Sequence, residues 1–233
     1  MTTGGPILLI DTATTRAVIA LGGADGSLRA ERGWTAGYRH GEELLERIER
    51  LLADEGVALA DLGAVAVGTG PGAFTGLRVG IATAKGLAHA LSVPIVGVAT
   101  GAALLDAAAS AAGTGALVLV QPAGPNDRVL VRRGEAARIL PGGTDPDLAP
   151  GERLVAVDLA GRSPEDAAAL GGLAVDGLAA AMLATAARRL AAGDADDLAR
   201  LVPEYVTLPR GVRMPQPDEG VEVSGATPER AKP

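Results

Sequence analysis

Hydrophobic and polar positions alternate most clearly over the first hundred residues. Two short apolar runs, 7–11 and 17–22, predict strands around a tight connection, and the more polar run 27–34 predicts a third strand. From Tyr38 to Glu55, leucine and isoleucine recur at helical spacing between charged residues, which predicts an amphipathic helix. The next expected elements are a buried strand, a helix and a short closing strand, at 64–68, from about Thr75 to Leu91, and at 94–98.

The second half of the chain carries weaker signals of the same kinds. An alanine-rich helix at 102–112 leads into four strand candidates separated by glycine, proline and asparagine. Ser163 and Pro164 predict a helix start, as cap and first residue, and Asp176 to Ala192 predicts one more helix. Helical crossovers favour parallel strands, so the order predicts an α/β fold with mixed sheets. We expect lobes over 1–100 and 101–210 and a disordered tail over 211–233.

Composition narrows the chemistry. Hydrophobic residues make up 48% of the chain and aromatic residues 2%, so burial must come from many small aliphatic contacts and close helix packing. The absence of cysteine excludes disulfides and thiolate chemistry, and the two histidines, His40 and His89, are too few for a multi-histidine metal centre. We therefore expect no bound metal.

Charge and hydropathy indicate where the protein works. A formal net charge of -7 argues against direct binding of nucleic acid, which normally needs a basic surface, so a partner would have to hold any RNA. No run approaches the roughly 20 apolar residues of a bilayer span, and the start lacks the features of a secretory signal. We expect a cytoplasmic protein with no membrane contact.

The first candidate site is the hydroxyl-rich segment 11–15, between two predicted strands. A strand followed by Asp and a short Thr-rich turn is typical of loops that face phosphates, so Asp11, Thr12 and Thr14 are candidates for a nucleotide or anion cleft. Ala13 stands where a glycine would let a phosphate approach more closely. An ordinary Asp/Thr turn explains the same residues.

The second candidate site is the glycine-rich segment 68–80. Gly70 and Gly72 flank a proline in a tight strand-to-helix turn, and Thr75 is placed to cap a helix whose N–H groups would face the same cleft. The segment matches neither GxxxxGK[ST] nor GxGxxG. A purely structural turn therefore stays open as the alternative.

The segment VGTGPGAFTGLRVG at 67–80, together with ILLIDTAT, RHGEELLERIERLL and the late PEYV, resembles the TsaB family, also called YeaZ. The resemblance is dense over 7–100 and sparser to about 210. It implies a two-lobed actin-like ATPase fold (ASKHA, ribonuclease H-like), with mixed sheets flanked by helices and a reduced second lobe. It also implies an accessory subunit that works with a TsaD-like protein and a TsaE-like ATPase. Together they transfer threonylcarbamoyl to the adenosine beside the anticodon of ANN-decoding tRNAs.

A helix-pair interface with partners is the next expectation. The second helix has apolar residues in a 4-3-4-3 spacing, and the resemblance implies that it and the first helix serve self-association into a homodimer and, alternatively, TsaD binding. The alternative is that both stripes are satisfied inside the monomer core. The expected interface residues are His40, Leu44, Leu45, Ile48, Leu51, Leu77, Ile81, Ala84 and Ala88.

No catalytic residue is predicted. The catalytic relatives carry paired histidines on the second helix, whereas this chain has only His89 there, which we interpret as a partly buried helix residue. We expect no cofactor beyond weak nucleotide binding, or binding shared with TsaD at their interface. A small-molecule kinase or ATPase using Asp11 is the main alternative, and a glycoprotease-like metallopeptidase is a weaker one. The loop 121–128 and the segment 203–206 depart from the family pattern.

Overall fold

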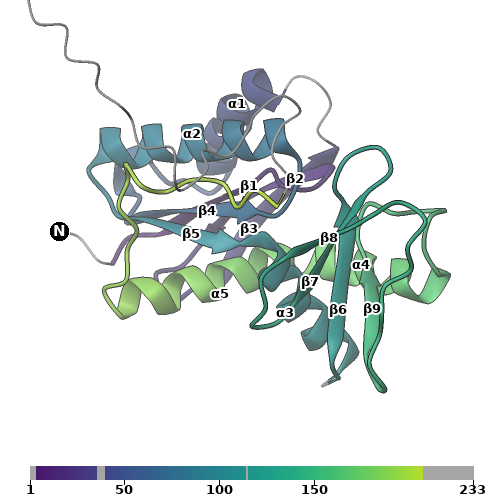
Figure 1. The fold of residues 1–233 in the computed structure, drawn as a ribbon. Helices are drawn as coiled ribbons and strands as arrows, with labels where there is room; N and C mark the ends of the chain where they lie inside the picture. The colour runs from purple at the N-terminus through teal and green to yellow at the C-terminus, as the bar shows by residue number, and fades with distance from the viewer. Residues whose placement is uncertain (1–3, 36–39, 114, 207–233) are drawn as a thin grey trace, which may run out of the picture.

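The computed structural model describes residues 4–35, 40–113 and 115–206 of the chain, and for residues 40–42 only the backbone. The predicted tail over 211–233 lies outside these residues. Helices and strands alternate along the chain much as the hydrophobic pattern predicts (Figure 1). In chain order they are β1 Ile7–Asp11, β2 Arg16–Gly22, β3 Leu28–Thr35, α1 His40–Asp54, the short 3-10 turn η1 Leu59–Asp61, β4 Ala64–Gly70, α2 Phe74–Leu91, β5 Ile95–Ala99, α3 Thr100–Ala112, β6 Leu117–Pro122, β7 Arg128–Arg132, β8 Arg138–Leu140, β9 Arg153–Ala156, α4 Glu165–Asp176 and α5 Leu178–Ala191.

The first sheet has five strands in the order β3-β2-β1-β4-β5. β1 pairs antiparallel with β2 and parallel with β4, and β4 pairs parallel with β5, which makes the sheet mixed as predicted. α1 and α2 cover one face, and α3 and α5 lie on the other (Figure 1). β1 is buried on both faces because Leu8 and Ile10 pack with α1 and α2, while Ile7 and Leu9 pack with α3 and α5.

The second sheet has four strands in the order β8-β7-β6-β9, with β6 parallel to β9 and the other pairs antiparallel. The two sheets, each flanked by helices, confirm the predicted α/β fold class. One hydrophobic cluster runs through both units: it joins Leu9 and Val98 of the first sheet to Leu119 and Val155 of the second through α3, α4 and α5. We call it the shared core. The boundary predicted at residue 100 thus falls inside a continuous apolar interior.

Two helix starts differ from the prediction. Ala73 is the N-cap of α2, whereas Thr75 lies exposed in the first turn of the helix. The prediction that Thr75 caps this helix is therefore wrong. Pro164 is the N-cap of α4, and the Ser163 hydroxyl donates instead to the Leu159 carbonyl at 3.0 Å. In both cases the cap residue makes no side-chain hydrogen bond to the helix.

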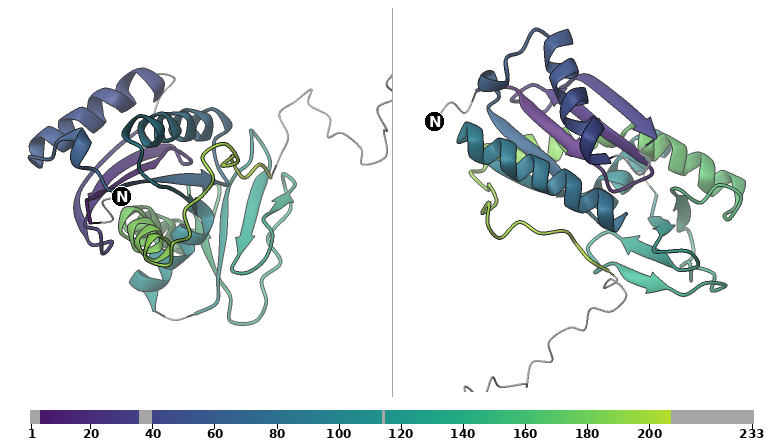
Figure 2. Two further views of the ribbon diagram at one scale, coloured as in Figure 1. Left: turned by 90° about the vertical axis from the view of Figure 1, so that its left-hand side faces the viewer. Right: turned by 90° about the horizontal axis from the view of Figure 1, so that it is seen from above.

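The last described segment, residues 194–206, lies along the edge of the first sheet, and we call it the C-terminal strap. Asp196 N donates to the Ile95 carbonyl at 2.9 Å, and Glu204 N donates to the Thr69 carbonyl at 2.8 Å. Lys85 of α2 donates to the carbonyls of Ala199 and Leu201. The strap therefore follows α2 toward the second sheet (Figure 2) and supplies hydrogen-bond partners to a strand edge.

In the described part of the chain, no single helix has the length and apolar character needed to span a bilayer. The only pair there to meet that test is α4 with α5, which are bent by 52° and pass by length and composition only when joined.

Candidate functional site

Asp11 ends β1 and is fully buried. One carboxylate oxygen accepts from the Thr100 hydroxyl at 2.7 Å, and the other accepts from Ala13 N at 3.1 Å. The Thr100 oxygen in turn accepts from Gly70 N at 3.2 Å. Burial raises the pKa of Asp11 above its ordinary value of 3.8, although these hydrogen bonds act in the opposite direction. The carboxylate therefore connects three elements inside the protein and does not face a cleft.

Thr12 is covered directly by the start of α2. Its hydroxyl donates to the Gly76 carbonyl at 2.7 Å. A Cβ at Gly76 would stand 2.1 Å from the Thr12 carbonyl oxygen, and a Cβ at Gly80 would stand 2.3 Å from the Thr12 hydroxyl oxygen. These two glycines are required because the helix backbone lies against the loop.

The glycines before α2 act in the same way. A Cβ at Gly72 would stand 2.3 Å from the Ala13 carbonyl oxygen, which already accepts from Ala73 N at 2.7 Å. Gly70 has a φ of 104°, a conformation that side chains rarely adopt, and precedes a cis proline, Pro71. The glycine-rich segment is thus a packing device, as its structural alternative predicts, and its backbone is engaged by the loop at 11–15.

The predicted cleft residues therefore divide into three groups. Asp11, Thr12, Gly70 and Gly72 are brought together, but by internal packing. Thr14 is buried, and its hydroxyl donates to the Arg16 carbonyl at 2.8 Å. Thr75 is exposed on α2.

Thr15, which is not among the predicted site residues, makes the contact to the second unit. Its backbone N donates to one oxygen of Asp158 at 2.8 Å, and its hydroxyl donates to the other at 2.5 Å. Asp158 follows β9, 143 positions later in the chain. Neither the residue types nor their spacing points to this pair, because only the packing of the two sheets brings it together.

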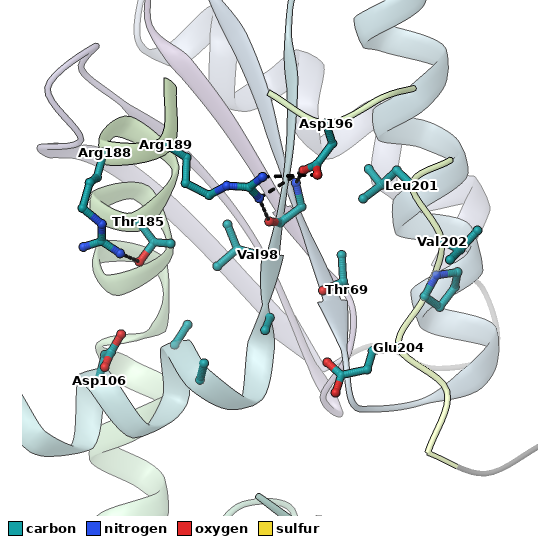
Figure 3. Close-up of a pocket in the computed structure, with 15 residues that line it drawn as sticks. Thr69, Val98, Asp106, Thr185, Arg188, Arg189, Asp196, Leu201, Val202 and Glu204 are labelled. Carbon is teal, nitrogen blue, oxygen red and sulfur yellow. Dashed lines mark hydrogen bonds and ion pairs between the residues drawn. The ribbon is translucent and has the colours of Figure 1, made fainter. Parts of the chain in front are cut away.

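A cavity of about 560 Å³ lies between the end of β5, α3, α5 and the strap (Figure 3). Arg189 projects from α5 into it and pairs with Asp194 at 2.7 Å and Asp196 at 3.1 Å, while also donating to the Gly97 carbonyl. Burial raises the pKa of Glu204 on the opposite wall. Since the Arg189 charge is paired within the chain, the cavity offers the exposed Arg188 as its remaining cation.

Three side chains stack at the N-terminal end of α2. The Arg78 guanidinium lies 4.0 Å from the centre of the Phe74 ring, and the Phe74 and Tyr205 ring centres are 5.2 Å apart. Arg78 Nε also donates to the Tyr205 hydroxyl at 3.1 Å. A cation over an aromatic face is an attractive arrangement, so this stack fixes the strap to α2.

Most of the predicted interface residues are core residues. The structure buries the side chains of Leu44, Ile48, Leu51, Leu77, Ile81, Ala84 and Ala88, each with at most 5% exposure. These seven are therefore wrong as contact residues, because one stripe of each helix packs on its own sheet. Leu45 is 50% exposed, and the side chain of His40 lies outside the described residues.

The outward face of α2 carries small residues instead. Ala82, Gly86 and Ala90 are exposed, and a Cβ at Gly86 would meet no described atom within 4 Å. His89 is also exposed, which corrects its prediction as a partly buried residue. We call Leu45 together with Ala82, Gly86 and Ala90 the outer helix face. Among the described residues, no group of three or more His, Cys, Asp or Glu is arranged to hold a metal ion.

Comparison with known proteins places this architecture. Residues 35–209 match the family described as TsaD: tRNA N6-adenosine threonylcarbamoyltransferase. YeaZ from Pseudomonas aeruginosa, a solved structure, superposes with a TM-score of 0.65 at 26% identity, over 86% of this chain and 99% of that one. The tRNA threonylcarbamoyladenosine biosynthesis protein TsaB of Escherichia coli is 40% identical over 94 residues, 40% of each chain. The chain belongs to the TsaB (YeaZ) family.

The matches to curated relatives differ in length. An uncharacterized protein of Mycobacterium leprae is 40% identical over 170 residues, which are 71% of this chain and 45% of that protein. The aligned segments thus span less than half the length of these curated relatives. The superposition nevertheless confirms a YeaZ-like fold, and membership associates the chain with a family involved in tRNA threonylcarbamoyladenosine biosynthesis.

Two TsaB motif segments that are far apart in the sequence meet in the structure. Phe74 and Arg78 come from the glycine-rich segment. Tyr205 comes from segment 203–206, one of the two segments whose sequence departs from the family pattern. Gln121 belongs to the other such segment, 121–128. Its Nε2 donates to the Pro71 carbonyl, while its Oε1 has no partner among the described atoms. Both departures from the TsaB pattern therefore lie against the same loop.

Proposed function

We propose that this TsaB-family chain is a non-catalytic accessory subunit for threonylcarbamoyl transfer to the adenosine adjacent to the anticodon of ANN-decoding tRNAs. In this proposal it pairs with a TsaD-like protein and works with a TsaE-like ATPase, while tRNA is held through these partners. Without them it forms a homodimer through the same surface.

The observation that carries the proposal is the commitment of Asp11 and Thr12 to internal packing. A kinase or ATPase of this fold would need a solvent-facing acid for Mg²⁺ or as a base, and Asp11 has 0% exposure and two internal hydrogen bonds. Thr12 donates its hydroxyl to the α2 backbone. Two residues of the predicted phosphate-facing loop are thus committed to internal packing, which supports a scaffold role.

The outer helix face supports the docking part of the proposal. Small side chains at Ala82, Gly86 and Ala90 of α2 let a second helix approach closely. Leu45 of α1, the helix that covers the same sheet face as α2, offers an exposed apolar anchor. The outer helix face replaces the buried stripe that the helical spacing predicts as the interface.

A matched pair of surface variants tests this docking. Leu45→Arg and Gly86→Arg place a charge on the outer helix face, whereas Leu173→Arg places one on α4, where the leucine is 47% exposed. The first two should weaken binding to the TsaD-like partner roughly tenfold or more by sedimentation or calorimetry, and Leu173→Arg should leave it unchanged. Equal affinities for all three, with folding retained, would refute the docking surface.

Nucleotide and metal assignments require separate measurements. In this proposal the isolated protein has no cofactor of its own, and nucleotide is bound weakly or shared at the partner interface. Titration with ATP and Mg²⁺ should therefore give neither micromolar affinity nor turnover. Tight binding with hydrolysis would favour the kinase alternative, and stoichiometric zinc or iron in the purified protein would favour a metallopeptidase.

The cellular role is tested by depleting the protein in its native host and measuring modified nucleosides in bulk tRNA. Threonylcarbamoyladenosine should fall, and a plasmid copy should restore it. Restoration by the Leu173→Arg variant but not by Leu45→Arg would connect the cellular role to the outer helix face. Unchanged threonylcarbamoyladenosine after depletion would refute the function.

A further inference from the structure

The cavity beside β5 is a site that the proposed function does not use. Its volume of about 560 Å³ lies within the range of roughly 300 to 1,000 Å³ that small-molecule sites occupy. Thr69 and Ala99, near the carboxyl ends of the parallel strands β4 and β5, are part of its lining. Ligands of α/β sheets bind most often at that end of the strands. None of residues 11–15 lines the cavity, so it is separate from the predicted phosphate-facing loop.

Most of the charge around the cavity is neutralised within the chain. The charged side chains that line it are Asp106, Arg188, Arg189, Asp196 and Glu204. Arg189 pairs with Asp196 at 3.1 Å, and Asp106 pairs with Arg133. Two opposite charges are left without an ion pair among the described residues, one on α5 and one on the C-terminal strap.

These two charges, Arg188 and Glu204, lie on opposite walls of the cavity (Figure 3). The Arg188 guanidinium donates to the Thr185 hydroxyl at 3.3 Å, which leaves most of its N–H groups for a ligand. The Glu204 carboxylate points from the strap toward the wall formed by α3 and α5, and Glu204 N is held by the Thr69 carbonyl at 2.8 Å. Partial loss of water raises the pKa of Glu204. A cationic group of a ligand would offset that loss.

The surface between the two charges is apolar. Val98 and Ala103 are buried beneath the cavity, and Leu201 forms part of the strap wall. From this arrangement we infer that the cavity binds a small zwitterion, an amino acid or a short peptide, with its carboxylate on Arg188 and its ammonium on Glu204. Both contacts are charge-assisted hydrogen bonds, and a guanidinium can hold a carboxylate through two of them. The inference does not depend on the docking surface proposed above, which lies on α1 and α2.

Titrations of the full chain with L-leucine and with the dipeptide leucyl-leucine, followed by calorimetry and NMR, test the inference. At least one of them should bind with a Kd of about 1 mM or tighter, and the tighter of the two distinguishes an amino-acid site from a peptide site. Blocking the amino group by acetylation, or the carboxyl group as its amide, should weaken binding at least about tenfold. Weaker binding than about 1 mM by both probes would overturn the inference, as would equal binding of the blocked forms.

Two variants assign each ligand charge to its residue. Arg188→Gln should weaken binding of the zwitterion at least about tenfold but leave binding of the amide unchanged. Glu204→Gln should weaken the zwitterion similarly and leave the acetylated form unchanged. Both side chains are exposed, so the variants should fold.

Matched controls separate these contacts from a general effect of net charge. Arg29→Gln and Glu165→Gln change exposed charges that do not line the cavity, and both should bind the probes as wild type does. Equal losses in the cavity variants and the controls would overturn the inference. Wild-type affinity in Arg188→Gln or in Glu204→Gln would do the same.

Discussion

α2 carries glycines on two different faces, and they serve different purposes. Gly76 and Gly80 face the protein's own loop, where an added Cβ would stand 2.1 and 2.3 Å from atoms of Thr12. Gly86 faces outward, where an added Cβ would meet no described atom within 4 Å. One helix thus uses the same residue type to fit its own fold and, as we propose, to admit a partner. Sequence spacing alone does not distinguish these two uses.

The largest effect is expected for Gly76→Ala on the inner face. The new methyl group would overlap the Thr12 carbonyl oxygen, and neither backbone can move without disturbing the sheet. We expect a loss of about 4 kcal/mol in the free energy of unfolding, or no folded protein. Urea denaturation measures this loss. A variant as stable as wild type would contradict the account of the inner face.

A somewhat smaller effect is expected on α1, where adjacent leucines face opposite ways. Leu44 has 0% exposure, and Leu45 is 50% exposed. Leu44→Ala should cost about 3 kcal/mol through the cavity it leaves, whereas Leu45→Ala should change stability by less than about 0.5 kcal/mol. Only Leu45→Ala should keep the protein's stability while weakening its binding to the TsaD-like partner. Similar stabilities for the two variants would contradict the assignment of Leu44 to the buried face of α1 and Leu45 to its exposed face.

A pH experiment examines the buried Asp11, which is hydrogen-bonded to Thr100 at the start of α3. Burial raises the pKa of Asp11 above 3.8 in the folded state. The folded protein therefore binds a proton at this carboxyl group more tightly than the unfolded chain does. The contribution of Asp11 to stability is therefore greatest below pH 3.8 and falls as pH rises through the folded-state pKa. Asp11→Asn should remove this fall. Parallel unfolding curves for wild type and variant over that range would show that the burial of Asp11 has no such effect.

The smallest effect is a gain in stability on the outer face. Gly86→Ala adds a methyl group where no described atom lies within 4 Å and replaces the poorer helix former. Stability should rise by about 0.5 to 1 kcal/mol, measured by thermal unfolding. The gain would fail to appear if this face were covered within the monomer.

Much of the fold was predictable because the strands and helices of the first unit carry strong periodic signals. The helix predicted from Tyr38 to Glu55 is observed as His40–Asp54, and that predicted from Thr75 to Leu91 as Phe74–Leu91. Helix starts were less predictable, since the caps at Ala73 and Pro164 are set by backbone conformation and not by a capping side chain.

The site was predictable only in part. The glycine-rich segment marks the correct loop, but periodicity cannot say whether Leu77 and Ile81 face the sheet or a partner, and the structure buries both. Thr15 with Asp158 and Phe74 with Tyr205 are long-range pairs formed only after the two sheets and the strap are packed. Such pairs leave no signal in the local order of residues.

The shared core has a practical consequence for dissecting the molecule. A fragment ending at the predicted lobe boundary, residue 100, would lose α5 and all but the first residue of α3. Ile7, Leu9 and Val98 would then be exposed on one side of the first sheet. Such a fragment should aggregate on expression. Limited proteolysis of the intact chain should not release two stable halves. Mapping of partners and tags should therefore use point variants of the intact chain.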